Sequence, residues 1–159
     1  MIGLLGGIAS SRLVTSFEGD LLIHPQLAFF MPLVAAMGGN AGVQSSAIIV
    51  QGLANNTLGT RNVLPKLGKE FMVALLNGLI CALIIYGYNF IIGNPDDVSY
   101  TVAFALISVI IFASILGTLV PMLLDKMNID PALATGPFIT TSNDLLGLGL
   151  YFWIGRLFL

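Results

Sequence analysis

The amino-acid sequence predicts an all-α integral membrane protein with five transmembrane helices. Of the 159 residues, 57% are apolar and only 9% are charged, whereas about 25% are charged in a typical soluble protein. The mean hydropathy is +0.96, and long apolar segments alternate with short loops that hold most of the charge. A soluble fold of this size must cover its surface with polar groups, and too few are present. We therefore expect membrane lipid to surround the chain.

The predicted spans follow from the length of the apolar segments. A spanning helix needs about 20 residues at a rise of 1.5 Å each. The first candidate is short and rich in Gly and Ser, the second contains Pro32, the next two are strongly apolar, and the last has a polar run at its centre. Together they form a single membrane domain over residues 1–159, with helices at about 1–17, 25–54, 71–92, 98–124 and 131–159.

The basic residues predict the orientation of these spans. The loops at 55–70 and 125–130 contain lysine or arginine, whereas the loops at 18–24 and 93–99 contain neither. The positive-inside rule places the basic loops in the cytoplasm. With five spans, the N-terminus is then cytoplasmic and the C-terminus external, so any region upstream of this chain would also be cytoplasmic.

Composition argues against several function classes. The net charge is −2 with only six Lys and Arg residues, and nucleic-acid binding needs a dense basic face. Cys81 is the only cysteine and His24 the only histidine, so a disulfide framework or a zinc cluster of these residues cannot form. No Ser-His-Asp set or phosphate-binding glycine loop is present either. We expect neither an enzyme nor an organic cofactor.

Asp144 lies near the middle of the last predicted span. Thr140, Gly147 and Tyr151 share its helix face at i−4, i+3 and i+7. A carboxylate at membrane depth is costly and therefore indicates a partner or a path for ions. The favoured interpretation is a carboxylate that faces an aqueous cation path. The alternative is a structural aspartate held by neighbouring hydroxyl and amide groups.

A second polar cluster occupies residues 38–46 of the second span. Asn40, Gln44 and Gln51 fall on one helix face, and the nearby glycines permit close backbone approach. Such glycines more often serve helix packing, so packing and ion binding both stay open here. A third feature, Asp130 before Pro131, is typical of a helix start. It is also compatible with an acidic ring at a cytoplasmic pore mouth.

These residues suggest a divalent cation path shared by two subunits. Mg²⁺ takes oxygen ligands and keeps several of its waters. A few carboxylate, amide and carbonyl groups can therefore bind the hydrated ion through its water shell. One aspartate per chain does not balance a doubly charged ion. A two-fold homodimer, the commonest oligomer, would place two copies of Asp144 opposite each other. Paired carboxylates in a narrow pore attract cations and repel anions.

Two segments resemble a known family. The sequence MPLVAAMGGNAGVQS at residues 31–45 is similar to the second membrane helix of MgtE-type magnesium channels, and DPALATGPFITTSND at residues 130–144 is similar to the fifth. The order of the two motifs and the five-span layout also match. The resemblance implies a homodimeric Mg²⁺ channel of the cell (inner) membrane, lined by the second and fifth helices of each subunit.

The resemblance also assigns roles to residues. Asp144 matches the pore aspartate that holds hydrated Mg²⁺ with its symmetry mate, and the backbone carbonyl of Thr140 faces the same ion. Asp130 matches an acidic residue near the cytoplasmic mouth. The predicted metal site comprises Asp144, Thr140, Asn40, Gly39 and Gln44. The predicted pore lining comprises Val43, Ala47, Thr141, Gly136 and Gly147.

The sequence departs from the family pattern at three positions and in its extent. Asn143 replaces the expected Ser or Thr, and Val43 and Gly136 stand where some members carry Asn, so the resemblance does not fix selectivity among Mg²⁺, Mn²⁺, Co²⁺ and Ca²⁺. The family's cytoplasmic regulatory part, an N-terminal helical domain and paired CBS domains, is not found in this sequence. Two other functions stay open: a carrier coupled to Na⁺ or H⁺, and a non-conducting membrane anchor.

Overall fold

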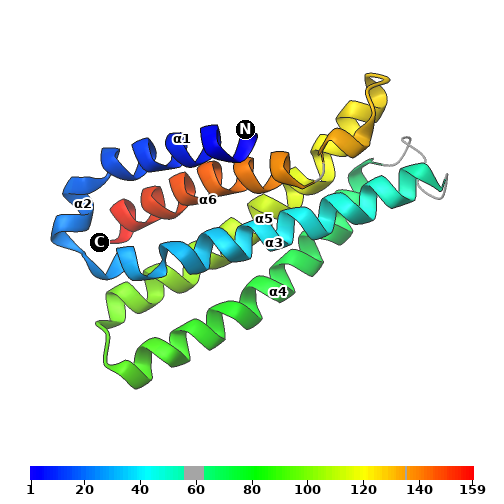
Figure 1. The fold of residues 1–159 in the computed structure, drawn as a ribbon. Helices are drawn as coiled ribbons and strands as arrows, with labels where there is room; N and C mark the ends of the chain where they lie inside the picture. Colours follow the sequence, from blue (N-terminus) through cyan, green and yellow to red (C-terminus); the bar gives the residue numbers. More distant parts are fainter. Residues whose placement is uncertain (56–62, 135) are drawn as a thin grey trace.

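The computed structural model describes residues 1–55, 63–134 and 136–159, and the structural statements below concern these residues. Arg61, one of the residues behind the predicted orientation, lies outside them. The helices are α1 (Ile2–Ser16), α2 (Glu18–Ile23), α3 (Gln26–Ala54), α4 (Val63–Ile92), α5 (Asp96–Lys126), the 3₁₀ helix η1 (Pro131–Ala134) and α6 (Pro137–Phe158). They run roughly along one long axis (Figure 1).

Three helices are long and apolar enough to cross a membrane: α3, α4 from Pro65 onward, and α5. This finding confirms the all-helical membrane class and three of the predicted spans. The other two predicted spans correspond to α1, with 15 residues, and α6, with 22 residues and a polar run inside it. The five-span layout therefore stays a prediction, as do the orientation and the dimer.

The last predicted span, over residues 131–159, is not one continuous helix, so the prediction of a single helix there is wrong. The short helix η1 ends at Ala134, and α6 starts at Pro137. Gly136 between them has φ +61° and ψ −126°, a conformation that residues with a side chain avoid. Proline disfavours a helical conformation in the preceding residue, and its own ring suits the first helical position. The Gly-Pro pair thus separates the two helices.

Two other boundaries differ from the prediction. The helix α4 begins at Val63, eight residues before the predicted start at 71. Hydropathy detects where a helix enters the membrane, and α4 continues beyond that point through a charged turn. Residues 18–24, expected to be a loop, contain the short helix α2, which has Glu18 and Asp20 in its first turn. Acidic side chains there favour a helix N-terminus.

The helix α5 is the centre of the packing. It contacts α3, α4, α6 and η1, while α1 packs on α6. Its side chains dominate the core, with Val102, Ala105 and Val109 fully buried. Within the described residues, α3 and α4 both pack along α5 but hardly touch each other. At the far end of α1, the ring of Phe17 stacks on that of Phe152 of α6, with centroids 5.0 Å apart.

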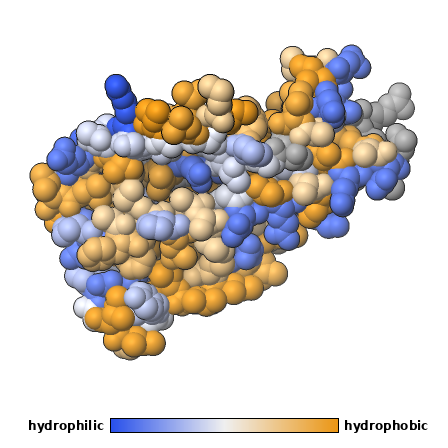
Figure 2. Space-filling model, viewed as in Figure 1, coloured by the Kyte–Doolittle hydropathy of each residue, from blue (hydrophilic) through white to orange (hydrophobic). Residues whose placement is uncertain are grey.

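Much of the surface is apolar, as Figure 2 shows. The outer face of α4 carries Leu76, Leu83 and Ile91, which are 63%, 72% and 83% exposed. A large exposed apolar surface of this kind marks a site of contact with a membrane or with another protein. Hydrophilic residues gather toward the end of the molecule where α3 ends, α4 begins and η1 lies (Figures 1 and 2). This end contains the predicted cytoplasmic loops.

Candidate cation site at the crossing of α3 and α6

Glycines bring three helices close together at Gly42 of α3. A Cβ at Gly42 would overlap the amide group of Asn143 on α6, and a Cβ at Gly117 of α5 would overlap the carbonyl oxygen of Gly42. Small residues at such positions are what lets membrane helices approach closely. The packing role considered for the glycine-rich segment is therefore present in the structure. It also fixes the position of α6 against α3.

Asn143 is a residue of this crossing that the sequence interpretation did not assign. Its side chain is 2% exposed, and its Nδ2 lies 3.5 Å from the carbonyl oxygen of Gly38 on α3. Its Oδ1 has no hydrogen-bond partner within the described residues. Nothing in the local sequence distinguishes Asn143 from the neighbouring polar residues. Only the way the two helices cross shows that it faces α3.

Asp144 follows directly and is half-buried beside α3. Its Oδ1 lies 3.9 Å from the position that a Cβ would take on Gly39. Among the described residues, none forms a hydrogen bond or ion pair with this carboxylate, and no group of three His, Cys, Asp or Glu could enclose a metal ion. The carboxylate is therefore available to a ligand, but it needs oxygen atoms from elsewhere to complete a divalent cation site.

The face of α3 next to Asp144 carries polar and small side chains. We call Asn40, Gln44, Ala47 and Gln51 the α3 stripe; all four are exposed and lie on one side of the helix. Val43 is half-buried between this stripe and α6. Amide groups exposed to hydrocarbon are costly because the bilayer offers no hydrogen-bond partner. A stripe with three amides is therefore expected to face water or another protein surface.

Other predicted pore residues have contacts within the chain. The side chain of Thr141 lies against Gly6 of α1, where a Cβ would overlap its methyl group. Gly147 is buried, and the Val109 side chain of α5 lies 3.1 Å from its Cβ position. The hydroxyl of Thr140 donates to the carbonyl oxygens of Gly136 and Pro137, both at 3.2 Å. The structure thus brings Gly39 and Asp144 together, and it packs Thr141 and Gly147 against other helices.

Asp130 has a capping role. Its Oδ1 accepts a hydrogen bond from the backbone N–H of Ala132 at 2.9 Å, so it caps η1 rather than a long final helix. With Asp125 it also lines a cavity of about 240 Å³ between η1 and the C-terminal ends of α3 and α5. The capping interpretation is confirmed, and the acidic pore mouth stays a prediction.

The fold and the site define a helical membrane protein in which the half-buried carboxylate of Asp144 lies beside a polar helix face. Comparison with known families gives a narrower assignment. Residues 31–154 match the family model MgtE, described as divalent cation transporter. The chain belongs to the MgtE family.

Three similar curated proteins carry the name magnesium transporter MgtE. The protein of Bacillus subtilis is 35% identical over 153 residues, which is 96% of this chain and 34% of that protein. The Thermus thermophilus protein is 33% identical over 159 residues, 100% of this chain and 35% of the relative. The Enterococcus faecalis protein is 32% identical over 153 residues, which is 96% of this chain and 34% of the relative. The chain thus spans about a third of the length of these relatives.

Proposed function

We propose that this chain transports Mg²⁺ across the cell (inner) membrane as a homodimer with a pore lined by α3 and α6. The family and the names of its relatives support the ion and the activity. The observation that carries the site is the open carboxylate of Asp144 beside Gly39. A glycine at this point leaves space next to the carboxylate, and an ion that keeps its waters needs such space.

The five-span layout is compatible with the dimensions of the helices. At 1.5 Å per residue, the 22 residues of α6 span roughly the 30 Å of a bilayer core. The 15 residues of α1 are shorter than the core, which membrane proteins accommodate by local thinning of the bilayer or by oligomerisation. In this layout the N-terminus is cytoplasmic and the C-terminus external.

The α3 stripe supports the dimer. In a single copy the exposed amides of Asn40 and Gln51 would contact lipid, while Gln44 also lines the cavity between α3 and α4. In a two-fold assembly the stripe would meet a water-filled path or the other subunit. Two copies of Asp144 would then supply a charge of −2, which matches one Mg²⁺. The amides of Asn40 and Gln44 contribute oxygen atoms that can contact the water shell of the ion.

The proposal predicts that Mg²⁺ uptake depends on Asp144. Purified protein in liposomes that contain a Mg²⁺-sensitive dye should admit Mg²⁺, and Asp144→Ala should lower the rate by about tenfold or more, because the variant removes the carboxylate of both subunits and with it the whole paired charge of −2. Asp144→Asn keeps the size and should also be slow. Asp96→Asn removes an exposed carboxylate at the start of α5 and should leave uptake unchanged.

Two results would overturn the proposal. Undiminished flux in both Asp144 variants would remove this carboxylate from the ion path, and no flux at all in the native chain would favour a membrane anchor. The same liposomes separate a channel from a coupled carrier, because an imposed Na⁺ or H⁺ gradient changes uptake only in a coupled carrier.

A further inference from the structure

We propose that an anionic phospholipid binds in the groove between α3 and α4, with its phosphate at Lys66 and Lys69 and an acyl chain over α5. The site does not include Asp144, although Gln44 of the α3 stripe also lines its first cavity, and it does not depend on whether the chain conducts ions. The proposal rests on the membrane location of the chain. The proposed orientation decides only that the lipid belongs to the cytoplasmic leaflet.

The groove exists because α3 and α4 pack on α5 rather than on each other. Three cavities of about 260, 210 and 510 Å³ follow one another between the two helices. The second and third share Leu33, Ile84 and Ile85 in their walls. The first and second are joined at Asn77 and Cys81, which lie one helical turn apart and whose side chains are 3.7 Å from each other. The groove therefore extends along most of α4.

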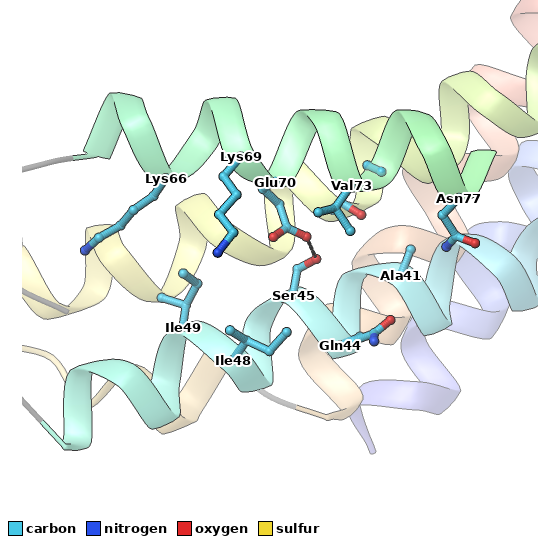
Figure 3. Close-up of a pocket in the computed structure, with 12 residues that line it drawn as sticks. Ala41, Gln44, Ser45, Ile48, Ile49, Lys66, Lys69, Glu70, Val73 and Asn77 are labelled. Carbon is cyan, nitrogen blue, oxygen red and sulfur yellow. Dashed lines mark hydrogen bonds between the residues drawn. The ribbon is translucent and has the colours of Figure 1, made fainter. Parts of the chain in front are cut away.

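One end of the groove is polar and basic. Lys66, Lys69 and Glu70 of α4 all line the first cavity. Figure 3 shows Lys69 pointing toward α3 beside Glu70, and Lys66 extending from the preceding turn toward the start of α4. The carboxylate of Glu70 accepts a hydrogen bond from the hydroxyl of Ser45 on α3, a side chain that is 2% exposed. The formal charges of Lys66, Lys69 and Glu70, the ionisable residues that line this cavity, sum to +1. This end is complementary to a singly charged phosphodiester.

The remaining walls suit a hydrocarbon chain. Beyond the lysines, Ile48, Ile49 and Val73 line the first cavity, and the second is lined by apolar side chains and Cys81. A free phosphate ion would use only the basic end. A phospholipid uses both ends, because its phosphate meets the lysines while its acyl chain covers apolar wall. Basic pockets between membrane helices on the cytoplasmic side are known sites for anionic lipid headgroups.

A lipid titration of the detergent-purified protein tests the site. Phosphatidylglycerol should raise the melting temperature more than phosphatidylcholine does, and inorganic phosphate should have little effect. In the double variant Lys66→Gln/Lys69→Gln, phosphatidylglycerol should bind about 30-fold more weakly, roughly five- to sixfold for each lysine. Lys126→Gln is the matched control: it removes a lysine at the end of α5, outside the groove, and should keep the native response.

A second variant tests the apolar part of the site. Val73 is 55% exposed and lines the first cavity, so Val73→Trp can fill the groove without entering the core. It should reduce the response to phosphatidylglycerol while the melting temperature in phosphatidylcholine stays native. The same baseline shows whether the lysine variant is folded.

Three outcomes would overturn the proposal. An unchanged response to phosphatidylglycerol in the double lysine variant would show that Lys66 and Lys69 do not bind the phosphate. An equal response to inorganic phosphate would show a site for a soluble anion. A lower dimer fraction of the groove variants in both lipids would show that a second copy covers the groove. If Asp144→Asn abolishes Mg²⁺ flux but keeps the response to phosphatidylglycerol, the lipid site is independent of the ion path.

Discussion

Glycine residues in this chain differ in what a methyl group at their position would meet. At Gly42 and Gly117 it would meet another helix, whereas at Gly87 of α4 nothing lies within 4 Å. The sequence shows both kinds as glycines in apolar helices and does not separate them. The difference depends on the helix crossing, which the local sequence does not encode.

We expect Gly117→Ala to destabilise the protein, because the new methyl group would lie against the backbone oxygen of Gly42. Backbone cannot rotate away as a side chain can, so α3 and α5 must separate. Overpacking of this kind costs about 1–3 kcal/mol, which thermal unfolding in detergent would detect as a lower melting temperature. Gly87→Ala is the control and should be neutral or stabilising by up to about 1 kcal/mol. Equal melting of both variants would contradict the observed crossing.

The candidate site shows the same limit of sequence reasoning. Asp144 could be singled out because a lone carboxylate in an apolar span is rare. The structure places it beside Gly39, and the metal site itself stays a prediction. The packing of Thr141 on α1 and of Gly147 on α5 could not be read from the sequence. Helical periodicity gives the face on which a residue lies, but not the helix that this face meets.

Single helices were predicted well where hydropathy and helix length coincide. The observed α3 begins one residue from the predicted start and ends at the predicted residue, Ala54. The prediction failed for α4, whose first turns carry Lys66, Lys69 and Glu70 outside the apolar segment. It also failed at Gly136-Pro137, where the sequence does contain a helix-breaking signal. There the apolar residues on both sides suggested a continuous span.

At this break, Gly136→Ala should lower stability, because a Cβ is strained at φ +61°. With ψ −126° the residue lies outside the left-handed helical region, and such sparsely populated backbone conformations cost about 1–3 kcal/mol for a residue with a side chain. Gly68→Ala, inside α4 and with nothing within 4 Å of its Cβ position, provides the comparison and should be neutral or stabilising. We expect this loss in the free energy of unfolding to appear in urea or thermal unfolding of the purified protein. A native melting temperature for Gly136→Ala would contradict the positive φ at this position.

The whole molecule exposes two different kinds of surface. The outer face of α4 is apolar and suits lipid, while the α3 stripe presents amides and the small side chain of Ala47. Composition predicted the first surface, since too few polar residues exist to cover it. The stripe was predicted from helical spacing, but a single chain does not reveal what lies opposite.

Cysteine cross-linking tests the proposed two-fold arrangement of the stripe. In a Cys81→Ser background, Ala47→Cys should give a covalent dimer with a mild oxidant, because Ala47 is exposed beside the proposed axis. Leu83→Cys, at a 72% exposed position on α4, should stay monomeric in the same membranes. Electrophoresis without reductant measures both. Comparable dimer yields from the two variants would indicate random collision and would count against the interface.

The central position of α5 has a consequence for biogenesis. Ribosomes deliver α3 and α4 before α5, yet within the described residues these two helices make little contact beyond the Ser45–Glu70 hydrogen bond, and both pack along α5. Until residues 96–126 enter the bilayer, the earlier pair has no shared neighbour to hold it, and Gly42 has no Gly117 to meet. Newly made copies must therefore keep two weakly attached helices in the membrane until the fifth element of the chain arrives.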